Sequence, residues 1–406
     1  MLGRDGKQMI AEDMLKLGKT SSVIREIFEY GNKRKQEIGE ENVFDFSLGN
    51  PSIPAPESVG KAIRDLLEEM DPTQLHGYTS APGDSKVRET IATYINETHG
   101  TNVRAQDIYM TVGAAASLTI SIKALAVPGD EFITFTPFFP EYRVFVEAAG
   151  AKLVPVPSRE EDFQIEMERF EKAITPHTKA VIVNSPNNPS GVVLSEENIQ
   201  EMCAVLQKKQ KEYGHAIYLI TDEPYRELVY DDIKVPYLIN YYDNTLVGYS
   251  FSKSMSLPGE RIGYIVVSNK MEQSEEVFAA VCGAGRALGY VCASSMFQRV
   301  VAKCIGQTSD VSVYKKNRDI LYEGLTKAGF QCVHPDGAYY LFVKAMEPDA
   351  KAFCEKAKAH ELLLVPADDF GCPGYVRISY CVSTEQIEKS LPIFEKLAQE
   401  YKNGLC

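Results

Sequence analysis

One lysine of the chain lies among small and polar residues in a pattern that suits attack on a carbonyl carbon. It is Lys253, which follows Ser250 and Ser252 in the segment YSFSKSMSLPGERIG and precedes Arg261 by eight residues. A desolvated lysine has a lowered pKa, and its neutral amine can act as a nucleophile. Arg261 offers a rigid fork that suits a phosphate, and Ser250 offers a further donor. A lysine alone is usually a surface side chain, but this combination favours a functional role.

Small residues open a predicted helix directly after a predicted strand. The run TVGAAASL places Gly113, Ala114 and Ala115 at this turn. Backbone N–H groups can approach an anion there, at the positive end of the helix dipole, and a phosphate is the natural ligand. Small residues at such a turn more often serve packing, so this motif alone does not decide the function.

A carboxylate and a phenol follow another predicted strand. Asp222 and Tyr225 lie three residues apart in the motif TDEPY. Ligands of open α/β sheets bind outside the carboxyl ends of the strands, so polar groups at this position are candidates for a site. A carboxylate there could bind a metal, pair with a lysine or hold a protonated heterocycle, and the motif leaves these alternatives open.

A doubly wound, mostly parallel α/β sheet is expected to position these residues. Apolar β-rich runs alternate with helical stretches between about residues 107 and 270, which is typical of parallel strands buried on both faces. One of the helices is predicted to begin after Ser195 and to end at Gly214. The predicted strands cover residues 107–112, 131–136, 152–157, 179–185, 218–223, 246–252 and 263–268.

The length of 406 residues and a change of pattern after about residue 290 predict two domains. We expect a large domain over residues 46–290 that carries the site. Residues 1–45 and 291–406 are expected to form a smaller α+β domain, in which long amphipathic helices surround short strands at 342–346 and 375–380.

Composition and motif searches exclude several classes of function. The net charge of −13 is spread along the chain without a basic block, which argues against nucleic-acid binding. Neither a signal peptide nor a run of about 18 apolar residues is present, so a cytoplasmic chain without a membrane partner is expected. The nine cysteines form no CxxC pair and the six histidines no HxxxH spacing, which predicts no metal. The segment GAGRALG (283–289) follows helical sequence, unlike a dinucleotide-binding loop.

The lysine segment resembles the pyridoxal phosphate (PLP) attachment signature of class I/II aminotransferases. The resemblance extends along nearly the whole chain and is carried by motifs in the family's order, namely LGNPSIPAP (48–56), GYTSAPGD (77–84), the Gly113 turn, TPFFPEY (136–142), NSPNNPSG (184–191), TDEPY, the lysine segment and YVRISY (375–380). It implies a fold type I enzyme of the aspartate aminotransferase type. Such an enzyme moves an amino group between an L-amino acid, with aspartate or glutamate as candidates, and a 2-oxo acid.

The resemblance also implies which residues bind the cofactor. Lys253 would form a Schiff base with PLP and, once freed, move a proton as general acid and base. Asp222 would keep the pyridine nitrogen protonated, so that the ring can accept electrons. The other cofactor-binding residues would be Asn188 and Tyr225 at the ring hydroxyl, Phe139 on the ring face, Gly113, Ala114, Ala115, Ser250 and Arg261 at the phosphate, and Ser252 beside the lysine.

Substrate binding and assembly follow from the same resemblance. Arg377 would bind the substrate α-carboxylate, with Asn188 and Gly49 beside it. Tyr78 would reach the cofactor phosphate of a neighbouring subunit, which implies a homodimer. Arg286, 33 residues after Lys253, is a candidate for binding a distal carboxylate across the same boundary. A helix-end arginine paired with a glutamate is the alternative for Arg286.

Two other functions compete with amino transfer. A lyase of the same fold that splits a C–S bond would need the same lysine, aspartate and arginine, so these residues do not separate the two reactions. A regulatory protein that carries this fold behind a DNA-binding module is the other alternative. The 47 residues before Leu48 are too few for a winged helix and a linker, which argues against it.

Overall fold

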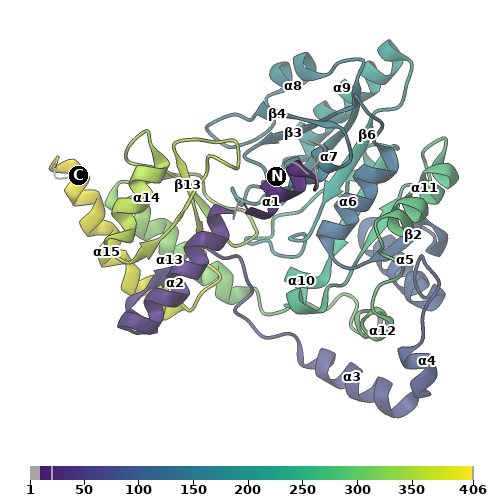
Figure 1. The fold of residues 1–406 in the computed structure, drawn as a ribbon, viewed down its shortest axis with the longest axis horizontal. Helices are drawn as coiled ribbons and strands as arrows, with labels where there is room; N and C mark the ends of the chain where they lie inside the picture. The colour runs from purple at the N-terminus through teal and green to yellow at the C-terminus, as the bar shows by residue number, and fades with distance from the viewer. Residues whose placement is uncertain (1–9, 20–21, 405–406) are drawn as a thin grey trace, which may run out of the picture.

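The protein folds into two lobes, each built around its own sheet (Figure 1). The structure, a computed structural model, describes residues 10–19 and 22–404. Residues 1–9, 20–21 and 405–406, which include part of the expected N-terminal arm, lie outside this description. The N-terminal helix α2 lies beside the C-terminal helices, so residues from both ends of the chain contribute to the same lobe (Figure 1).

The large lobe contains a seven-stranded sheet in which every predicted run forms a strand. The order across the sheet is β2-β8-β7-β6-β5-β3-β4. β8 is antiparallel to both of its neighbours, and the other neighbouring pairs are parallel, which confirms the predicted fold class. The strands are β2 (Ile108–Thr111), β3 (Glu131–Thr136), β4 (Lys152–Pro157), β5 (Thr178–Asn184), β6 (Tyr218–Asp222), β7 (Thr245–Ser250) and β8 (Gly263–Val267).

Helices cover both faces of this sheet because successive strand residues point to opposite sides. Ile182 and Ile220 are buried against α6 (Ala114–Leu125), α7 (Glu141–Ala148) and α11 (Ser274–Ala287). Their neighbours Val181 and Leu219 are buried on the other face, against α8 (Met167–Ala173) and α9 (Glu196–Tyr213). Ser195 caps α9, and Gly214 ends it in the left-handed conformation, as predicted.

A further helical layer packs against the part of the sheet that β2, β8 and β7 form. It contains α3 (Glu57–Glu69), α4 (Pro72–His76), α5 (Ser85–His99) and α12 (Ser295–Lys303). Val300 and Val301 of α12 share a buried cluster with Val59 of α3 and Ile91 of α5. α12 follows the expected boundary at residue 290 yet packs with helices of residues 46–290. The division into domains stays a prediction.

The small lobe is an α+β unit. β10 (Tyr340–Lys344) and β13 (Tyr375–Ser379) pair antiparallel at the centre of a four-stranded sheet, with β9 (Gln331–Cys332) and β12 (Val365–Pro366) at its edges. The N-terminal β1 (Phe44–Asp45) pairs with β11 (Leu362–Leu363). The helices of this part are α2 (Val23–Ile38), α13 (Ser312–Ala328), α14 (Ala350–Lys358) and α15 (Thr384–Lys402), and the short α1 (Glu12–Lys19) precedes α2 in the chain.

The described residues also bear on membrane-spanning helices, on the cysteines and on the segment GAGRALG. In residues 10–19 and 22–404, no helix is long and apolar enough to cross a membrane. The eight cysteines within the same ranges are all free. Residues 283–287 of the segment that resembles a dinucleotide loop lie in the last turns of helix α11, so helical residues precede this segment where a dinucleotide-binding loop would follow a strand end.

Candidate functional site

A cavity of about 310 Å³ brings together most of the residues selected from the sequence. It lies at the carboxyl ends of β6 and β7 and is also lined by residues of the small lobe. The predicted site residues that line it are Gly49, Ala114, Ala115, Phe139, Asn188, Asp222, Tyr225, Ser250, Ser252, Lys253, Arg261 and Arg377. These residues come from segments more than 300 positions apart in the chain, so tertiary folding alone places them together.

Lys253 lies in α10 (Phe251–Ser254), a short helix that begins where β7 ends. Its Nζ donates a hydrogen bond of 2.8 Å to the carbonyl oxygen of Gly49. Burial lowers the pKa of Lys253 to about 8, and the positive charges of Arg261 and Arg377 act in the same direction. An amine in this state loses its proton far more readily than a surface lysine does.

The turn at Gly113 is shaped to receive an anion beside Arg261. Gly113 has a φ of 95°, and a Cβ at this position would lie 2.6 Å from Nη2 of Arg261. The helix α6 begins at the next residue, so its free N–H groups face the same region. Arg261 is held by a 2.9 Å bond from Nη1 to the carbonyl oxygen of Pro258, and it lies 3.4 Å from Oγ of Ser252.

Asp222 ends β6 and is only 5% exposed. Its Oδ2 accepts a 2.5 Å hydrogen bond from Tyr142, whereas its Oδ1 is buried and has no partner among the residues that the structure describes. Burial raises the pKa of Asp222 to about 7. A buried carboxylate oxygen without a donor is costly, so this position favours a ligand that brings a donor, such as a protonated heterocycle.

Arg377 is a buried cation that forms no ion pair within the described part of the chain. It is 2% exposed, and it donates to Oδ1 of Asn188 at 3.2 Å and to the carbonyl oxygen of Ser47 at 2.6 Å. Its Nε is buried without a partner. A buried guanidinium needs an anion, and its geometry matches a carboxylate.

Aromatic residues complete the walls around Arg377 and Asp222. The hydroxyl groups of Tyr225 and Tyr340 lie 3.1 Å apart, and the Tyr340 ring lies 4.6 Å from the Arg377 guanidinium. A Cβ at Gly49 would come within 1.9 Å of the Tyr340 hydroxyl oxygen, which explains the glycine there. Phe139 packs edge to face on Tyr142 at 5.8 Å.

Three predicted site residues do not line the cavity. Gly113 shapes it through the neighbouring turn. Tyr78 is 94% exposed, and Arg286 is exposed in the last turn of α11. Within this single chain, neither Tyr78 nor Arg286 is brought to Lys253, so their expected roles stay predictions.

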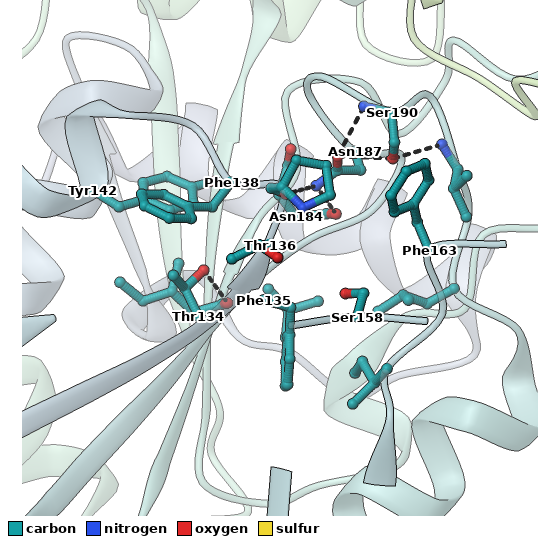
Figure 2. Close-up of a pocket in the computed structure, with 16 residues that line it drawn as sticks. Thr134, Phe135, Thr136, Phe138, Tyr142, Ser158, Phe163, Asn184, Asn187 and Ser190 are labelled. Carbon is teal, nitrogen blue, oxygen red and sulfur yellow. Dashed lines mark hydrogen bonds between the residues drawn. The ribbon is translucent and has the colours of Figure 1, made fainter. Parts of the chain in front are cut away.

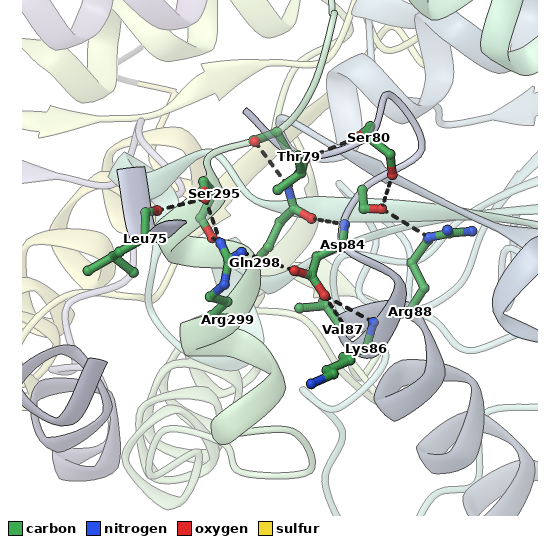
Figure 3. Close-up of polar contacts among 12 residues, drawn as sticks. Leu75, Thr79, Ser80, Asp84, Lys86, Val87, Arg88, Ser295, Gln298 and Arg299 are labelled. Atoms are coloured by element: carbon green, nitrogen blue, oxygen red, sulfur yellow. Dashed lines mark hydrogen bonds and ion pairs between the residues drawn. The ribbon is translucent and has the colours of Figure 1, made fainter. Parts of the chain in front are cut away.

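The segment that carries Tyr78 is nevertheless held firmly by polar contacts from α12 (Figure 3). Gln298 donates to Oγ1 of Thr79 at 3.2 Å and accepts a 2.8 Å bond from the backbone N–H of Asp84. Arg299 forms an ion pair of 3.0 Å with the Asp84 carboxylate. These contacts fix the backbone on the C-terminal side of an exposed tyrosine.

Some residues that line the cavity or contact its walls were not predicted from the sequence. Ile24, Leu48 and Tyr340 line it, and Tyr142 donates a hydrogen bond to Asp222. Tyr142 lies inside the recognised motif TPFFPEY, which was the available signal. Ile24 belongs to a helix 229 residues before Lys253 and carried no local signal. In the described ranges no cluster of three or more His, Cys, Asp or Glu could hold a metal.

Comparisons with known proteins agree on one family. The family described as "Aminotransferase class I and II" matches residues 41–392. The chain is 31% identical to an aspartate aminotransferase of Thermotoga maritima, over 87% of this chain and 91% of that protein. The crystal structure of an amino transferase from Eubacterium rectale has a TM-score of 0.96 and 58% identity, covering 97% of this chain and 100% of that one. An aspartate aminotransferase from Thermus thermophilus with maleate has a TM-score of 0.84 and 26% identity, with 96% and 100% coverage.

Proposed function

The chain belongs to the class I and II aminotransferase family and is an aminotransferase, and from this premise we propose that amino transfer takes place in the cavity around Lys253. The family implies PLP as the cofactor. The observation that supports this location most is that a single cavity contains a desolvated lysine, an unpaired carboxylate oxygen of Asp222 and an arginine without an ion-pair partner.

The residues present fit PLP at each of its polar groups. The Gly113 turn, the N-terminus of α6, Ser250 and Arg261 would hold the phosphate. Oδ1 of Asp222 lacks a donor, which the protonated ring nitrogen would supply. Asn188 and Tyr225 would bind the ring hydroxyl oxygen, and Phe139 would cover the ring face. When bound, PLP supplies a protonated ring that accepts the electron pair left at the substrate Cα.

Lys253 is proposed to attach the cofactor covalently and then to move a proton. Once free, its Nζ would accept the proton from the substrate Cα and donate it at C4′ of the cofactor. The lowered pKa of about 8 suits both tasks, because an amine with a pKa near neutrality can lose and regain a proton within one turnover.

Arg377 is proposed to bind the substrate α-carboxylate. Its position is already fixed by Asn188 and Ser47, so binding requires little reordering of the side chain. Gly49 keeps the backbone open on the same wall. Among the described residues the cations that line the cavity are Lys253, Arg261 and Arg377, and each already has a role. A dicarboxylic substrate would therefore need a further cation, for which Arg286 of a second subunit is the candidate.

We further propose that the enzyme works as a homodimer in the cytoplasm. The support for the dimer is the family motif that contains Tyr78, whose side chain is 94% exposed on a backbone that α12 holds in place and is therefore accessible to another chain. Tyr78 of each subunit would reach the phosphate in the other subunit.

The first prediction tests the attachment residue. Borohydride treatment of the loaded enzyme should leave the reduced cofactor on the peptide that contains Lys253, and Lys253→Ala should abolish turnover. Peptide mapping by mass spectrometry is the measurement. Cofactor on any other lysine would contradict the proposal. In loaded enzyme that has not been treated with borohydride, an amino acid alone should convert the cofactor to its amino form, whereas release of pyruvate and ammonia would indicate a lyase.

A further inference from the structure

Tyr142 contacts Asp222 but is not among the residues that line the cavity. It lies at the start of α7, is 1% exposed, and donates its hydroxyl proton to Oδ2 of Asp222 at 2.5 Å. The second carboxylate oxygen, Oδ1, has no partner, and Asp222 lines the cavity. The carboxyl group is thus held at one oxygen and open at the other.

In the hydrogen bond between Tyr142 and Asp222, the tyrosine hydroxyl is the donor and the carboxylate oxygen is the acceptor. Burial and the negative charge of Asp222 raise the pKa of Tyr142, so the hydroxyl keeps its proton. A hydrogen bond donated to the charged form of a carboxyl group favours that form. The effect of Tyr142 is therefore opposite to the effect of burial, which raises the pKa of Asp222.

The backbone of Asp222 is fixed independently of this contact. Nδ2 of Asn184 donates to the carbonyl oxygen of Asp222 at 2.7 Å, and β6 pairs with β5 and β7 up to this residue. Strand pairing therefore fixes the position of the Asp222 Cα. It does not fix the side-chain torsions that orient the carboxyl group. The tyrosine hydroxyl supplies the one hydrogen bond that the Asp222 carboxylate accepts in the described residues.

We propose that Tyr142 is a positioning residue that keeps Asp222 ionised and directs its free oxygen, Oδ1, toward the ring nitrogen of the cofactor. This inference rests on the proposed function for the identity of the cofactor, whereas the pairing of Tyr142 with Asp222 does not depend on it. Without the tyrosine hydroxyl, the buried carboxyl group would take up a proton at higher pH and could rotate. It would then pair less well with a protonated nitrogen.

The other charged and titratable groups around Asp222 act differently. Glu223, the next residue in the chain after the end of β6, disfavours a second negative charge and raises the pKa of Asp222. Tyr225 interacts with Asp222 through charge but directs its hydroxyl to Tyr340. Lys253 lines the same cavity and donates to Gly49. Tyr142 is thus the group whose hydrogen bond favours the carboxylate.

Replacement by phenylalanine isolates the hydroxyl group, because the ring has packing partners of its own. Tyr142 lines a cavity of about 30 Å³ together with Phe138 and Asn184 (Figure 2). It also packs edge to face against Phe139. Tyr142→Phe keeps these contacts and removes only the donor. Tyr242→Phe is the matched control, since Tyr242 is also buried in the large lobe and donates its hydroxyl to the carbonyl oxygen of Ile217.

The decisive experiment is an infrared pH titration of the protein without cofactor. The band of the protonated Asp222 carboxyl group is identified by its loss in Asp222→Asn, which separates it from the buried Glu227, whose pKa is also raised to about 7. In Tyr142→Phe the titration midpoint should move upward by about one pH unit, which is a tenfold change in proton affinity. In Tyr242→Phe it should not move. An unchanged midpoint in folded Tyr142→Phe overturns the proposal.

A second variant is expected to shift the Asp222 titration midpoint in the opposite direction. It replaces Tyr142→Phe in the experiment if that variant folds poorly. 3-Fluorotyrosine at position 142 is a more acidic donor of nearly the same size, so it should lower the Asp222 midpoint. A midpoint that stays or rises overturns the proposal. In the loaded enzyme, the acid limb of the kcat profile should move upward in Tyr142→Phe, with a smaller change in KM. If the carboxyl shifts occur but the cofactor is not on Lys253, the proposed function fails and the Tyr142 contact stands.

Discussion

At the scale of single residues, burial sets the protonation states on which the site depends. Lys253 and Asp222 line the same cavity, and burial moves both pKa values toward neutrality, from above for the lysine and from below for the carboxylate. Each shift favours the neutral form, which a low-dielectric site stabilises. The buried cation Arg377 and the unpaired Oδ1 of Asp222 add to this unfavourable energy, so the cofactor-free site is expected to be costly for the fold.

The second prediction measures part of that cost. Since the folded pKa of Lys253 is about 8 and its ordinary value is 10.5, the unfolded chain binds more protons between these two pH values. The free energy of unfolding therefore rises with pH across this window. The cost of burying the charged Lys253 amine is fully present below pH 8. Lys253→Met in the cofactor-free protein should gain up to about 3 kcal/mol at pH 7, at about 1.4 kcal/mol per pH unit, and progressively less toward pH 10.

Denaturant unfolding at several pH values, with cofactor removed, is the measurement for this prediction. Lys61→Met is the control, because Lys61 is exposed on α3 and no comparable change is expected. A gain in stability that is equal at pH 7 and pH 10 would attribute the effect to the apolar methionine side chain, and the buried charge would then have no part in it.

At the scale of secondary-structure elements, the ends of strands and the starts of helices carry the site. β6 ends in Asp222, β7 ends in Ser250 just before α10, and α6 begins directly after Gly113. Parallel strands direct their carboxyl ends to one edge of the sheet, which brings these termini together. The antiparallel β8 begins at the same edge, two residues after Arg261.

The third prediction concerns the glycine at the start of α6. Gly113→Ala should weaken PLP binding about tenfold or more, because a φ of 95° strains an alanine by about 1–3 kcal/mol and because the new Cβ would displace Arg261. Equilibrium dialysis of the cofactor is the measurement. Gly283→Ala is the control, since nothing lies within 4 Å of a Cβ there and the residue is inside α11. Equal affinities in both variants would mean that the turn does not bind the phosphate.

At the scale of the whole molecule, the cavity draws on both lobes and, in our proposal, on a second subunit. Ile24, Gly49, Tyr340 and Arg377 come from the N-terminal segment and the small lobe, whereas Lys253 and its neighbours come from the large one. Movement between lobes would therefore change the distance between the substrate carboxylate site and the lysine.

The fourth prediction tests the contribution of Tyr78 across a subunit boundary. Lys253→Ala homodimers and homodimers of a Tyr78 variant with weakened phosphate contact should each be impaired. A mixed dimer should recover one intact site, because one subunit supplies Lys253 and its partner supplies Tyr78. Activity after co-refolding of differently tagged chains is the measurement. A fully active monomer at working concentration would rule out this arrangement.

The fifth prediction concerns Arg286, which the structure leaves exposed at the end of α11. If it binds a distal carboxylate in the partner's site, Arg286→Leu should lower kcat/KM for aspartate or glutamate by about 2–5 kcal/mol in transition-state terms, as for loss of one partner of a buried charge pair. Uncharged amino acids should be spared. Equal losses for both classes of substrate, or a parent enzyme without dicarboxylate activity, would exclude this role.

The sequence by itself determined the strands, the α/β class and most of the residues of the cavity. Strands buried on both faces leave continuous apolar runs, and the groups that bind a cofactor follow them at strand ends, so local sequence carries both signals. Tertiary structure decided what depends on distant segments. It placed Ile24 and Tyr340 on the cavity wall, put α12 beside α3, and set Tyr142 against Asp222. These contacts arise from packing between elements far apart in the chain, for which no local pattern exists.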